Sequence, residues 1–429
     1  MNIQPYGIPD RRWSPKLTPW WFQLARFWRR RALKKQLITS IGVDGLEHLE
    51  GALKAGHGVL MTPNHSFHWD SYCLLEGAER LRTPFYFMTA WQVFAQSSWF
   101  DCESMRRCGC FSVDREGTDV QSLKTAVDVL QNQPQPLVIF PEGDVYHTND
   151  RVTPFRDGAA AMALMAARKA ERKVVIIPVA IKRWYTQDPT PSMLQTVEQL
   201  ERRLFWRPKH GVDLRHRILH VADGLLSLKE LEYFGRTTEG TLPERIKHLA
   251  SSVLNCCEDR YSIRTRDAMI PERIKEVRRR IIQAQQERAA KDATEASTFA
   301  GQPATAHQAA SVSVELDAQR RQWMADMDDM FLVTQLYSYP GDYMEQNPTW
   351  ERQAETLDKL EEDVLGASYP SVRGPRRVMV RFDEPYELPR GKEKKLSPAE
   401  VTDHLERRVQ WMLDDLNMRH GPQADQPTV

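Results

Sequence analysis

The sequence contains no long run of apolar residues, and this absence limits how the protein can meet a membrane. No stretch of about 18 consecutive apolar residues, the least that a bilayer-spanning helix needs, occurs among the 429 positions. With 41% hydrophobic residues, the chain can still bury a sizeable core. We therefore expect a folded protein that lies on a membrane surface if it meets one at all.

Cysteine is also scarce. Six cysteines do not make the dense framework of a small secreted domain, and no cleavable apolar leader opens the chain, so we expect reduced thiols and a cytoplasmic location. Cys102, Cys108 and Cys110 lie close in sequence but lack a C-x2-C pair and a histidine at ligand spacing. We expect ordinary thiols there and no metal site.

Charge of one sign is not in excess. The 59 Lys and Arg residues nearly equal the 58 Asp and Glu residues, so no global field attracts nucleic acid, and none is expected as a partner. An electrostatic partner must be recruited by a local patch.

One such patch is predicted at residues 18–35. Trp21, Leu24, Ala25 and Trp28 recur at helical spacing and predict an amphipathic helix. The same segment carries six cations: Arg26, Arg29, Arg30, Arg31, Lys34 and Lys35. Indole rings and cations together suit the surface of an anionic membrane, peripheral on its inner face. The alternative is a helix that packs its Trp stripe on the protein.

Between residues 40 and 225, short apolar runs alternate with helical patterns. The helices are expected at 119–132 and 156–171, and the strands are expected at Gly58–Met61, Phe85–Met88, Leu137–Phe140 and Val174–Ala180. Strands separated by helices of this length need crossover connections, which predicts an α/β fold with a mostly parallel central sheet covered by helices.

The C-terminal half has a different pattern. Charged helical patterns are expected at 264–290, 313–336 and 348–364, and a strand at Val378–Phe382. Ser397 and Glu400 make a capping box for a helix over 398–417. We expect an interfacial segment at 1–38 and a core at 39–230. A helical insertion is expected at 231–370, with a flexible linker near 291–312. A strand and a helix at 371–420 should return to the core, and 421–429 should be a disordered tail.

A histidine and a carboxylate follow the first predicted strand in the segment MTPNHSFHWDSY. His65 comes just after the strand, and Asp70 falls in the first turn of the next helix, where free N–H groups hold a carboxylate. Asp70 can then fix the imidazole tautomer, which leaves the other ring nitrogen to take a proton from a substrate hydroxyl. Taken alone the pair is weak, because one such spacing is expected by chance.

Two further segments carry charged residues that could bind a ligand. In LVIFPEG a strand runs into Glu142 and Gly143, at the edge where open α/β sheets bind ligands. In GCFSVDREG, Arg115 lies between glycines and suits a bidentate phosphate contact. The alternatives are a solvated turn for Glu142 and a surface ion pair with Asp114 or Glu116 for Arg115.

Together, NH-x4-D, GxFxxDR, FPEG and an apolar strand with Pro178, in this order, resemble the glycerolipid acyltransferase family that includes 1-acylglycerol-3-phosphate acyltransferases. The resemblance implies that His65 and Asp70 are catalytic. It implies substrate-binding roles for the other motif positions: Asn64, Phe111, Arg115, Glu142, Gly143, Ile177 and Pro178. Arg115 would contact the acceptor phosphate, Glu142 would position the acceptor, and the fourth motif would line the acyl-donor side.

The resemblance also implies the reaction. An acyl group would pass from acyl-CoA or acyl carrier protein directly to a lysolipid hydroxyl, without an acyl-enzyme, a metal or a cofactor, while backbone N–H groups stabilise the oxyanion. One departure concerns the acceptor: relatives continue FPEG with Thr-Arg-Ser, whereas this chain has Asp144, Val145 and Tyr146. Asp144 would repel a phosphate unless it is turned away or paired with Arg151 or Arg156.

Other interpretations remain open from sequence. His68 is a rival base but is expected to pack beside Trp69, and His147 is expected to be an ordinary loop histidine. A catalytically silent protein that binds lipid or partners through its N-terminal helix and helical insertion is the main alternative. A second alternative is a lipid hydrolase or transacylase that uses water or another phospholipid in place of the expected substrates. The chain has no G-x-S-x-G motif, which disfavours a serine hydrolase mechanism.

Overall fold

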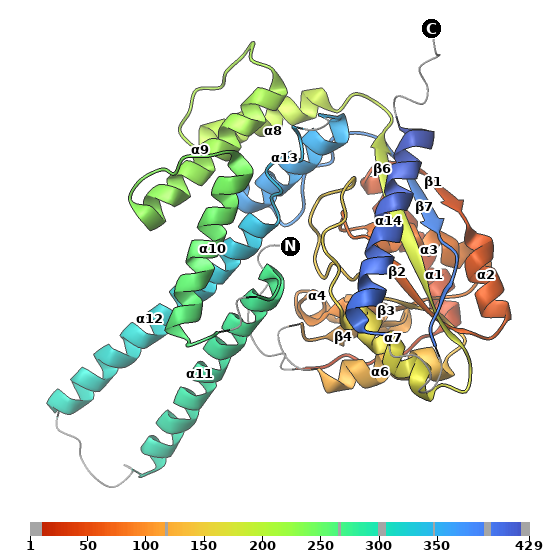
Figure 1. Cartoon of the computed structure of the whole chain (residues 1–429), viewed down its shortest axis with the longest axis horizontal. Coiled ribbons are helices and arrows are strands. Elements are labelled where there is room, and N and C mark those ends of the chain that lie inside the picture. The colour runs from red at the N-terminus through yellow and green to blue at the C-terminus, as the bar shows by residue number, and fades with distance from the viewer. Residues whose placement is uncertain are drawn as a thin grey trace. The chain divides into compact units, whose positions relative to one another are not determined.

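The computed structural model describes residues 11–115, 119–264, 267–298, 306–345, 348–389 and 396–421 (Figure 1). The chain divides into two compact units. A sheet-containing unit is formed by residues 9–218 and 347–429, and a helical unit is formed by residues 219–346. Among the described residues, no helix is both long and apolar enough to cross a bilayer.

The sheet-containing unit is built on an eight-stranded sheet. Its strands are β1 (Ile38–Asp44), β2 (Gly58–Pro63), β3 (Tyr86–Ala90), β4 (Cys110–Val113), β5 (Leu137–Val138), β6 (Val174–Tyr185), β7 (Arg376–Phe382) and β8 (Tyr386–Glu387). The order is β1-β7-β6-β2-β5-β3-β4, with β8 paired to β6. Only the pairings of β6 with β7 and β8 are antiparallel. The predicted α/β fold with a mostly parallel sheet is confirmed.

Helices cover both faces of this sheet (Figure 1). One face packs against α6 (Val120–Asn132), α7 (Gly158–Lys169) and α14 (Pro398–His420). The other packs against α1 (Pro19–Lys35), α2 (Leu46–Lys54) and α3 (Asp70–Leu81). Burial on two faces explains why β2 and β6 are apolar runs without alternation, as parallel strands require.

The predicted helix at 18–35 is present as α1, and Phe22, which lies outside the stripe of Trp21, Leu24, Ala25 and Trp28, is on its buried face. Phe22, Ala25 and Leu33 are buried, whereas Leu24 and Trp28 are exposed. Arg29 is buried because Glu79 on α3 neutralises it and its guanidinium lies over the Phe22 ring, 5.1 Å from the centroid. The helix therefore packs on the protein through its phenylalanine side and leaves much of its aromatic surface exposed.

The C-terminal segment returns to the sheet. β7 lies between β1 and β6, and α14 packs on β6 and α7. The capping box of α14 is present, since the Ser397 hydroxyl accepts the N–H of Glu400 and the Glu400 carboxylate accepts the N–H of Ser397.

The helical unit has a core of its own. It contains α9 (Leu214–Phe234, which begins in the other unit), α10 (Leu242–Arg260), α11 (Ile270–Thr298) and α12 (Ala306–Tyr337). The expected linker at 291–312 was partly wrong, because α11 and α12 continue through all of it except 299–305. Residues 299–305 and the expected tail at 422–429 lie outside the described residues.

The helical insertion was expected to extend to residue 370, but the helical unit ends at residue 346. α13 (Trp350–Leu365) belongs to the sheet-containing unit, where it packs against β6 and α8 (Thr190–Arg203). Arg373 holds it there, because its guanidinium bonds to Asp358 and Glu361 of α13 and to the Thr196 hydroxyl of α8.

Candidate active site

His65 and Asp70 form a hydrogen-bonded pair at the carboxyl end of β2. The strand ends at Pro63, and Asp70 is the first residue of α3. Asp70 Oδ2 accepts bonds from His65 Nδ1 at 3.1 Å and from the N–H groups of Ser66 and Phe67 at 2.8 Å each. Asp70 is fully buried, whereas 19% of the His65 side chain is exposed. A proton on Nδ1 leaves Nε2 as the basic nitrogen, as predicted from the spacing.

The His65 ring is held from a second side. It stacks on the Phe140 ring with centroids 4.1 Å apart and planes inclined by 30°. Phe140 follows β5, which pairs with β2, so the two strands that carry the first and third motifs place these rings together. The imidazole is thus fixed in orientation before a substrate arrives.

Glu142 lies beneath the loop that carries His65. Its Oε1 atom accepts the main-chain N–H of His65 at 2.6 Å, and its Oε2 atom accepts that of Thr153 at 3.1 Å. Burial raises the pKa of Glu142 to about 8, although these two N–H groups oppose the shift. Both oxygens of this 2% exposed residue are engaged by protein, so these contacts indicate a role in holding the first-motif loop. The acceptor-positioning role stays a prediction.

Arg115 lies against the third motif. Its Nη1 atom donates to the Gly143 carbonyl and is 3.8 Å from Asp144 Oδ2. Gly143 has a φ of +82°, and a Cβ there would come within 2.8 Å of the Arg156 guanidinium, so only glycine fits beneath that side chain. The structure thus brings together the second motif, the third motif and Arg156.

The charges of two arginines act on Asp144. Burial alone would raise the pKa of Asp144, but the charges of Arg115 and Arg156 and the N–H of Val145 hold it below its ordinary value. The ion pair at 3.8 Å is with Arg115, and the pairing with Arg151 or Arg156 expected from sequence stays a prediction.

The remaining predicted binding residues are buried. Asn64 is 1% exposed, and its amide bonds to the N–H and carbonyl of Ile181 on β6 at 2.7 and 3.1 Å. Phe111, Ile177 and Pro178 lie inside the two cores of the sheet. These contacts fasten the first-motif loop and the strands, and the substrate-binding roles of these four residues stay predictions.

Three main-chain N–H groups of the first-motif loop are already committed. Those of residues 65, 66 and 67 donate to Glu142 or Asp70. They therefore do not supply the oxyanion donors expected from sequence.

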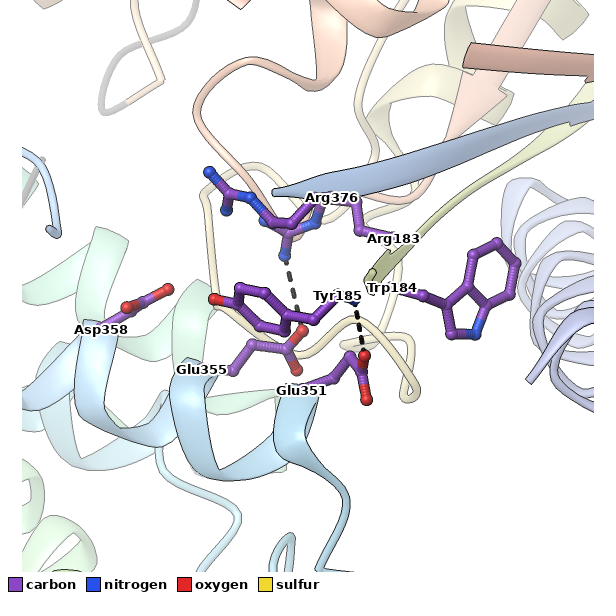
Figure 2. Close-up of a pocket in the computed structure, with 7 residues that line it drawn as sticks. All are labelled: Arg183, Trp184, Tyr185, Glu351, Glu355, Asp358 and Arg376. Carbon is purple, nitrogen blue, oxygen red and sulfur yellow. Dashed lines mark hydrogen bonds and ion pairs between the residues drawn. The ribbon is translucent and has the colours of Figure 1, made fainter. Parts of the chain in front are cut away.

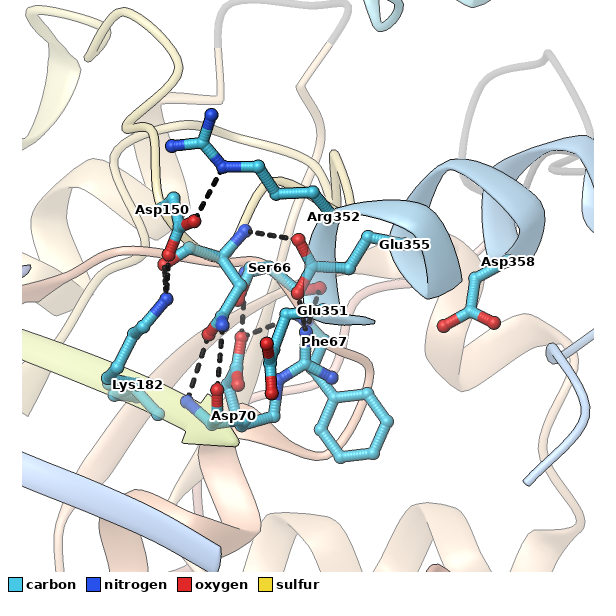
Figure 3. A network of polar contacts seen from close by, with 12 residues as sticks. Ser66, Phe67, Asp70, Asp150, Lys182, Glu351, Arg352, Glu355 and Asp358 are labelled. Carbon is cyan, nitrogen blue, oxygen red and sulfur yellow. Dashed lines mark hydrogen bonds and ion pairs between the residues drawn. The ribbon is translucent and has the colours of Figure 1, made fainter. Parts of the chain in front are cut away.

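An acidic face of α13 lies beside this loop (Figure 3). Arg183 on β6 donates to the Ser66 carbonyl at 3.1 Å and lies 3.5 Å from Glu355 on α13. Glu355 also accepts the N–H of Asn149 at 3.1 Å. The helix is thereby linked to the main chain of the loop between His65 and Asp70.

A second ion pair system continues the network. Arg352 on α13 bonds to Asp150 at 2.7 Å, and Asp150 neutralises the buried Lys182 (Figure 3). Burial lowers the pKa of Lys182 to about 8, which the charges of Glu355 and Glu351 oppose. These groups are structural, since a buried charge must be paired.

Between this helix and the end of β6 lies a small polar cavity (Figure 2). Its lining residues are Arg183, Trp184, Tyr185, Glu351, Glu355, Asp358 and Arg376. With five charged side chains among seven, the cavity does not suit an acyl chain.

The α13 contacts were missed from sequence, although a signal exists. Glu351, Glu355, Asp358 and Glu362 recur at i, i+4, i+7 and i+11, which places four acids on one helical face. The cations Lys182 and Arg183 continue the otherwise apolar run of β6. An acidic stripe and two cations inside a buried strand predict a partnership, but not which loop it supports.

Comparison with known proteins agrees with this geometry. Residues 40–182 match the family model Acyltransferase. The chain therefore contains a domain of the acyltransferase family, and the resemblance to glycerolipid acyltransferases is confirmed. A 1-acyl-sn-glycerol-3-phosphate acyltransferase of Streptococcus pneumoniae (strain ATCC BAA-255 / R6) is 30% identical over 123 residues, which are 28% of this chain and 40% of that protein. The match thus spans less than half of that relative.

Proposed function

We propose that the protein transfers a fatty acyl group from acyl-CoA or acyl carrier protein to the hydroxyl of a lysolipid, 1-acyl-sn-glycerol-3-phosphate or a close relative. The observation that carries this proposal is the hydrogen bond from His65 Nδ1 to the buried Asp70, within the acyltransferase domain. The similarity to the 1-acyl-sn-glycerol-3-phosphate acyltransferase of Streptococcus pneumoniae supports the acceptor class.

In the proposed mechanism, the acceptor oxygen attacks the thioester carbonyl carbon while its proton passes to Nε2 of His65. Proton transfer to a positioned base contributes ~10²–10⁴ in rate. Asp70 orients the ring and stabilises the imidazolium that forms. Collapse of the tetrahedral intermediate breaks the carbon–sulfur bond, and the thiolate takes the proton from His65. The products are an ester and a free thiol, and no acyl-enzyme forms.

Arg115 and Arg156 supply the acceptor preference in this proposal. They flank Asp144, so two guanidinium charges face one carboxylate, and one positive charge remains for a phosphate. Arg156 would thereby take the place of the arginine in the Thr-Arg-Ser segment that follows FPEG in relatives.

We place the enzyme on the inner, cytoplasmic face of a membrane through an aromatic patch on α1 and α5 (Trp99–Arg107). The two helices contact one another through the rings of Trp21 and Phe100. The aromatic patch consists of five exposed rings on these helices: Trp20, Phe27, Trp28, Trp99 and Phe100. The single carboxylate of Glu79 is shared by Arg26, Arg29 and Arg30 and offsets one of their three charges. Arg31, Lys34 and Lys35 add to the positive charge that this location would use.

The test is a thiol-release assay with palmitoyl-CoA and a panel of lysolipids, with products resolved by mass spectrometry. We expect acylation of a phosphate-bearing acceptor that depends on His65. Equal thiol release by wild type and His65→Ala would contradict the proposal. The absence of any acylated product would favour the silent lipid-binding alternative.

A further inference from the structure

Two histidines and a glutamate converge in a buried place beside the first-motif loop. His68 lies on that loop, His147 lies on the segment that follows Glu142, and Glu362 lies on α13. The Nε2 atoms of His68 and His147 lie 2.6 and 3.2 Å from the same atom, Oε1 of Glu362. The three side chains are 4%, 1% and 2% exposed. Three segments that are distant in sequence therefore bring two imidazole nitrogens and one carboxylate oxygen close together.

His147 is the unusual member of this group. Among the described residues, neither of its ring nitrogens has a partner with hydrogen-bond geometry, although Glu362 lies within ion-pair distance. Its backbone is also in the left-handed region, with a φ of +53°, which is uncommon for a residue other than glycine. A buried imidazole without a good hydrogen bond costs free energy, and strained backbone persists where the surroundings require it. Hydrogen bonding among the three side chains alone therefore does not explain why His147 is buried in this conformation.

We propose that His68, His147 and Glu362 bind a divalent transition-metal ion of the zinc class. Two imidazoles and one carboxylate are a donor set that suits Zn²⁺, with the fourth position open to a water molecule. The three ligand atoms lie within 4.8 Å of one another. A tetrahedral ion with bonds of about 2.0–2.1 Å needs them roughly 3.4 Å apart.

Small side-chain movements provide this geometry. The His147–Glu362 distance of 3.2 Å already fits, and the 2.6 Å separation of His68 from Glu362 must lengthen. The rings of His68 and His147, with centroids 5.4 Å apart and planes inclined by 71°, are not stacked on one another, so both nitrogens can face one ion. The ion would join α13 to the loops of the first and third motifs.

A second group of donors in the helical unit does not carry the same inference. Cys257, Asp326 and Asp329 also lie within reach of one another. However, Asp326 bonds to Arg260 and Tyr261, and Asp329 accepts a bond from the Tyr233 hydroxyl. These carboxylates are satisfied without an ion.

The experiment measures zinc directly. Untagged full-length protein is stripped with a chelator, equilibrated with Zn²⁺, passed through gel filtration and analysed by mass spectrometry for metal and protein. We expect one zinc per chain in the wild type. Either His147→Gln or Glu362→Gln should weaken zinc binding by more than the roughly 10–100-fold that the loss of an outer-shell partner costs. His216→Gln, which removes a 74% exposed imidazole, is the matched control and should bind as the wild type does.

A second measurement on the wild type guards against variants that fail to fold. Co²⁺ in place of Zn²⁺ should give the visible absorption of a four- or five-coordinate site, and Zn²⁺ should displace it at one equivalent. Less than a tenth of an equivalent of zinc in the wild type overturns the proposal. So does equal zinc in the wild type, His147→Gln and Glu362→Gln. Neither measurement depends on acyl transfer, so the site and the proposed function can fail separately.

Discussion

The Oε1 atom of Glu142 accepts the main-chain N–H of His65 at 2.6 Å, which links the third motif to the backbone of the proposed base. Because Glu142 is buried and bonded to the protein, we expect it to affect the reaction by holding His65 in position.

The ionisation of Glu142 should make stability depend on pH. Its pKa is raised to about 8 in the folded protein, against an ordinary value near 4.3 for the unfolded chain. Between these values the folded state binds the additional proton. The contribution of Glu142 to stability is therefore complete below about pH 4.3 and is lost as the pH rises through about 8.

Glu142→Gln isolates this contribution, because glutamine does not titrate. Urea unfolding of both proteins at several pH values from 5 to 8 gives the difference in free energy of unfolding. We expect the wild type to lose stability relative to the variant as the pH rises, by up to ~1.4 kcal/mol per pH unit. A difference that stays constant over this range would mean that Glu142 is ionised throughout.

Arg115 and Arg156 should control the acceptor. A hydrogen bond to a charged group contributes ~1.5–3 kcal/mol, so Arg115→Ala or Arg156→Ala should raise the KM for a lysophosphatidic acid by roughly 10–100-fold. The KM for an uncharged monoacylglycerol should change little. Arg202→Ala, at an exposed position on α8, is the control. Similar losses with both acceptors would place the phosphate elsewhere.

The Arg183–Glu355 pair should matter for stability and for the loop that it supports. Both side chains are 5% exposed, and removal of one partner of a buried pair costs ~3–5 kcal/mol. Glu355→Gln should therefore destabilise the sheet-containing unit and lower kcat, because Arg183 also holds the Ser66 carbonyl.

A double-mutant cycle separates this pair from its surroundings. Arg183→Met combined with Glu355→Gln should cost less than the sum of the two single changes, measured by urea unfolding. Additive losses would show that the two residues do not interact.

The aromatic patch should hold the protein on anionic vesicles. The double variant Phe27→Ser, Trp28→Ser lacks two exposed rings. Full burial of one such ring in lipid contributes ~1.5–3 kcal/mol to the free energy of membrane binding. Co-sedimentation with phosphatidylglycerol vesicles should fall at least tenfold. Phe205→Ser removes a ring that is 97% exposed outside the patch and should have no effect. Equal losses in both proteins would exclude a specific role for the patch.

Much of the fold could be predicted from sequence because strong local patterns determine it. The apolar strands, the position of Asp70 at the start of α3 and the capping box of α14 all depend on residues near in sequence. The first-motif pair could be predicted for the same reason, since five residues separate His65 from Asp70.

Contacts between distant segments could not be predicted in the same way. Glu355 and Ser66 are far apart in sequence, and no periodicity shows that Arg183 joins them. The burial of Arg29 on α1 could not be predicted either, because it depends on Glu79 of another helix. Partnerships of this kind depend on tertiary packing, which the one-dimensional pattern does not contain.

The central claim is that His65, oriented by Asp70, takes the proton of the acceptor hydroxyl. The most direct measurement is the rate of thiol release from palmitoyl-CoA with 1-acyl-sn-glycerol-3-phosphate, for wild type, His65→Ala and Asp70→Asn, with circular dichroism as the check on folding. The account predicts that His65→Ala lowers kcat by at least ~10²–10⁴ and that Asp70→Asn also lowers it, while both variants stay folded. A folded His65→Ala variant with wild-type turnover would contradict it.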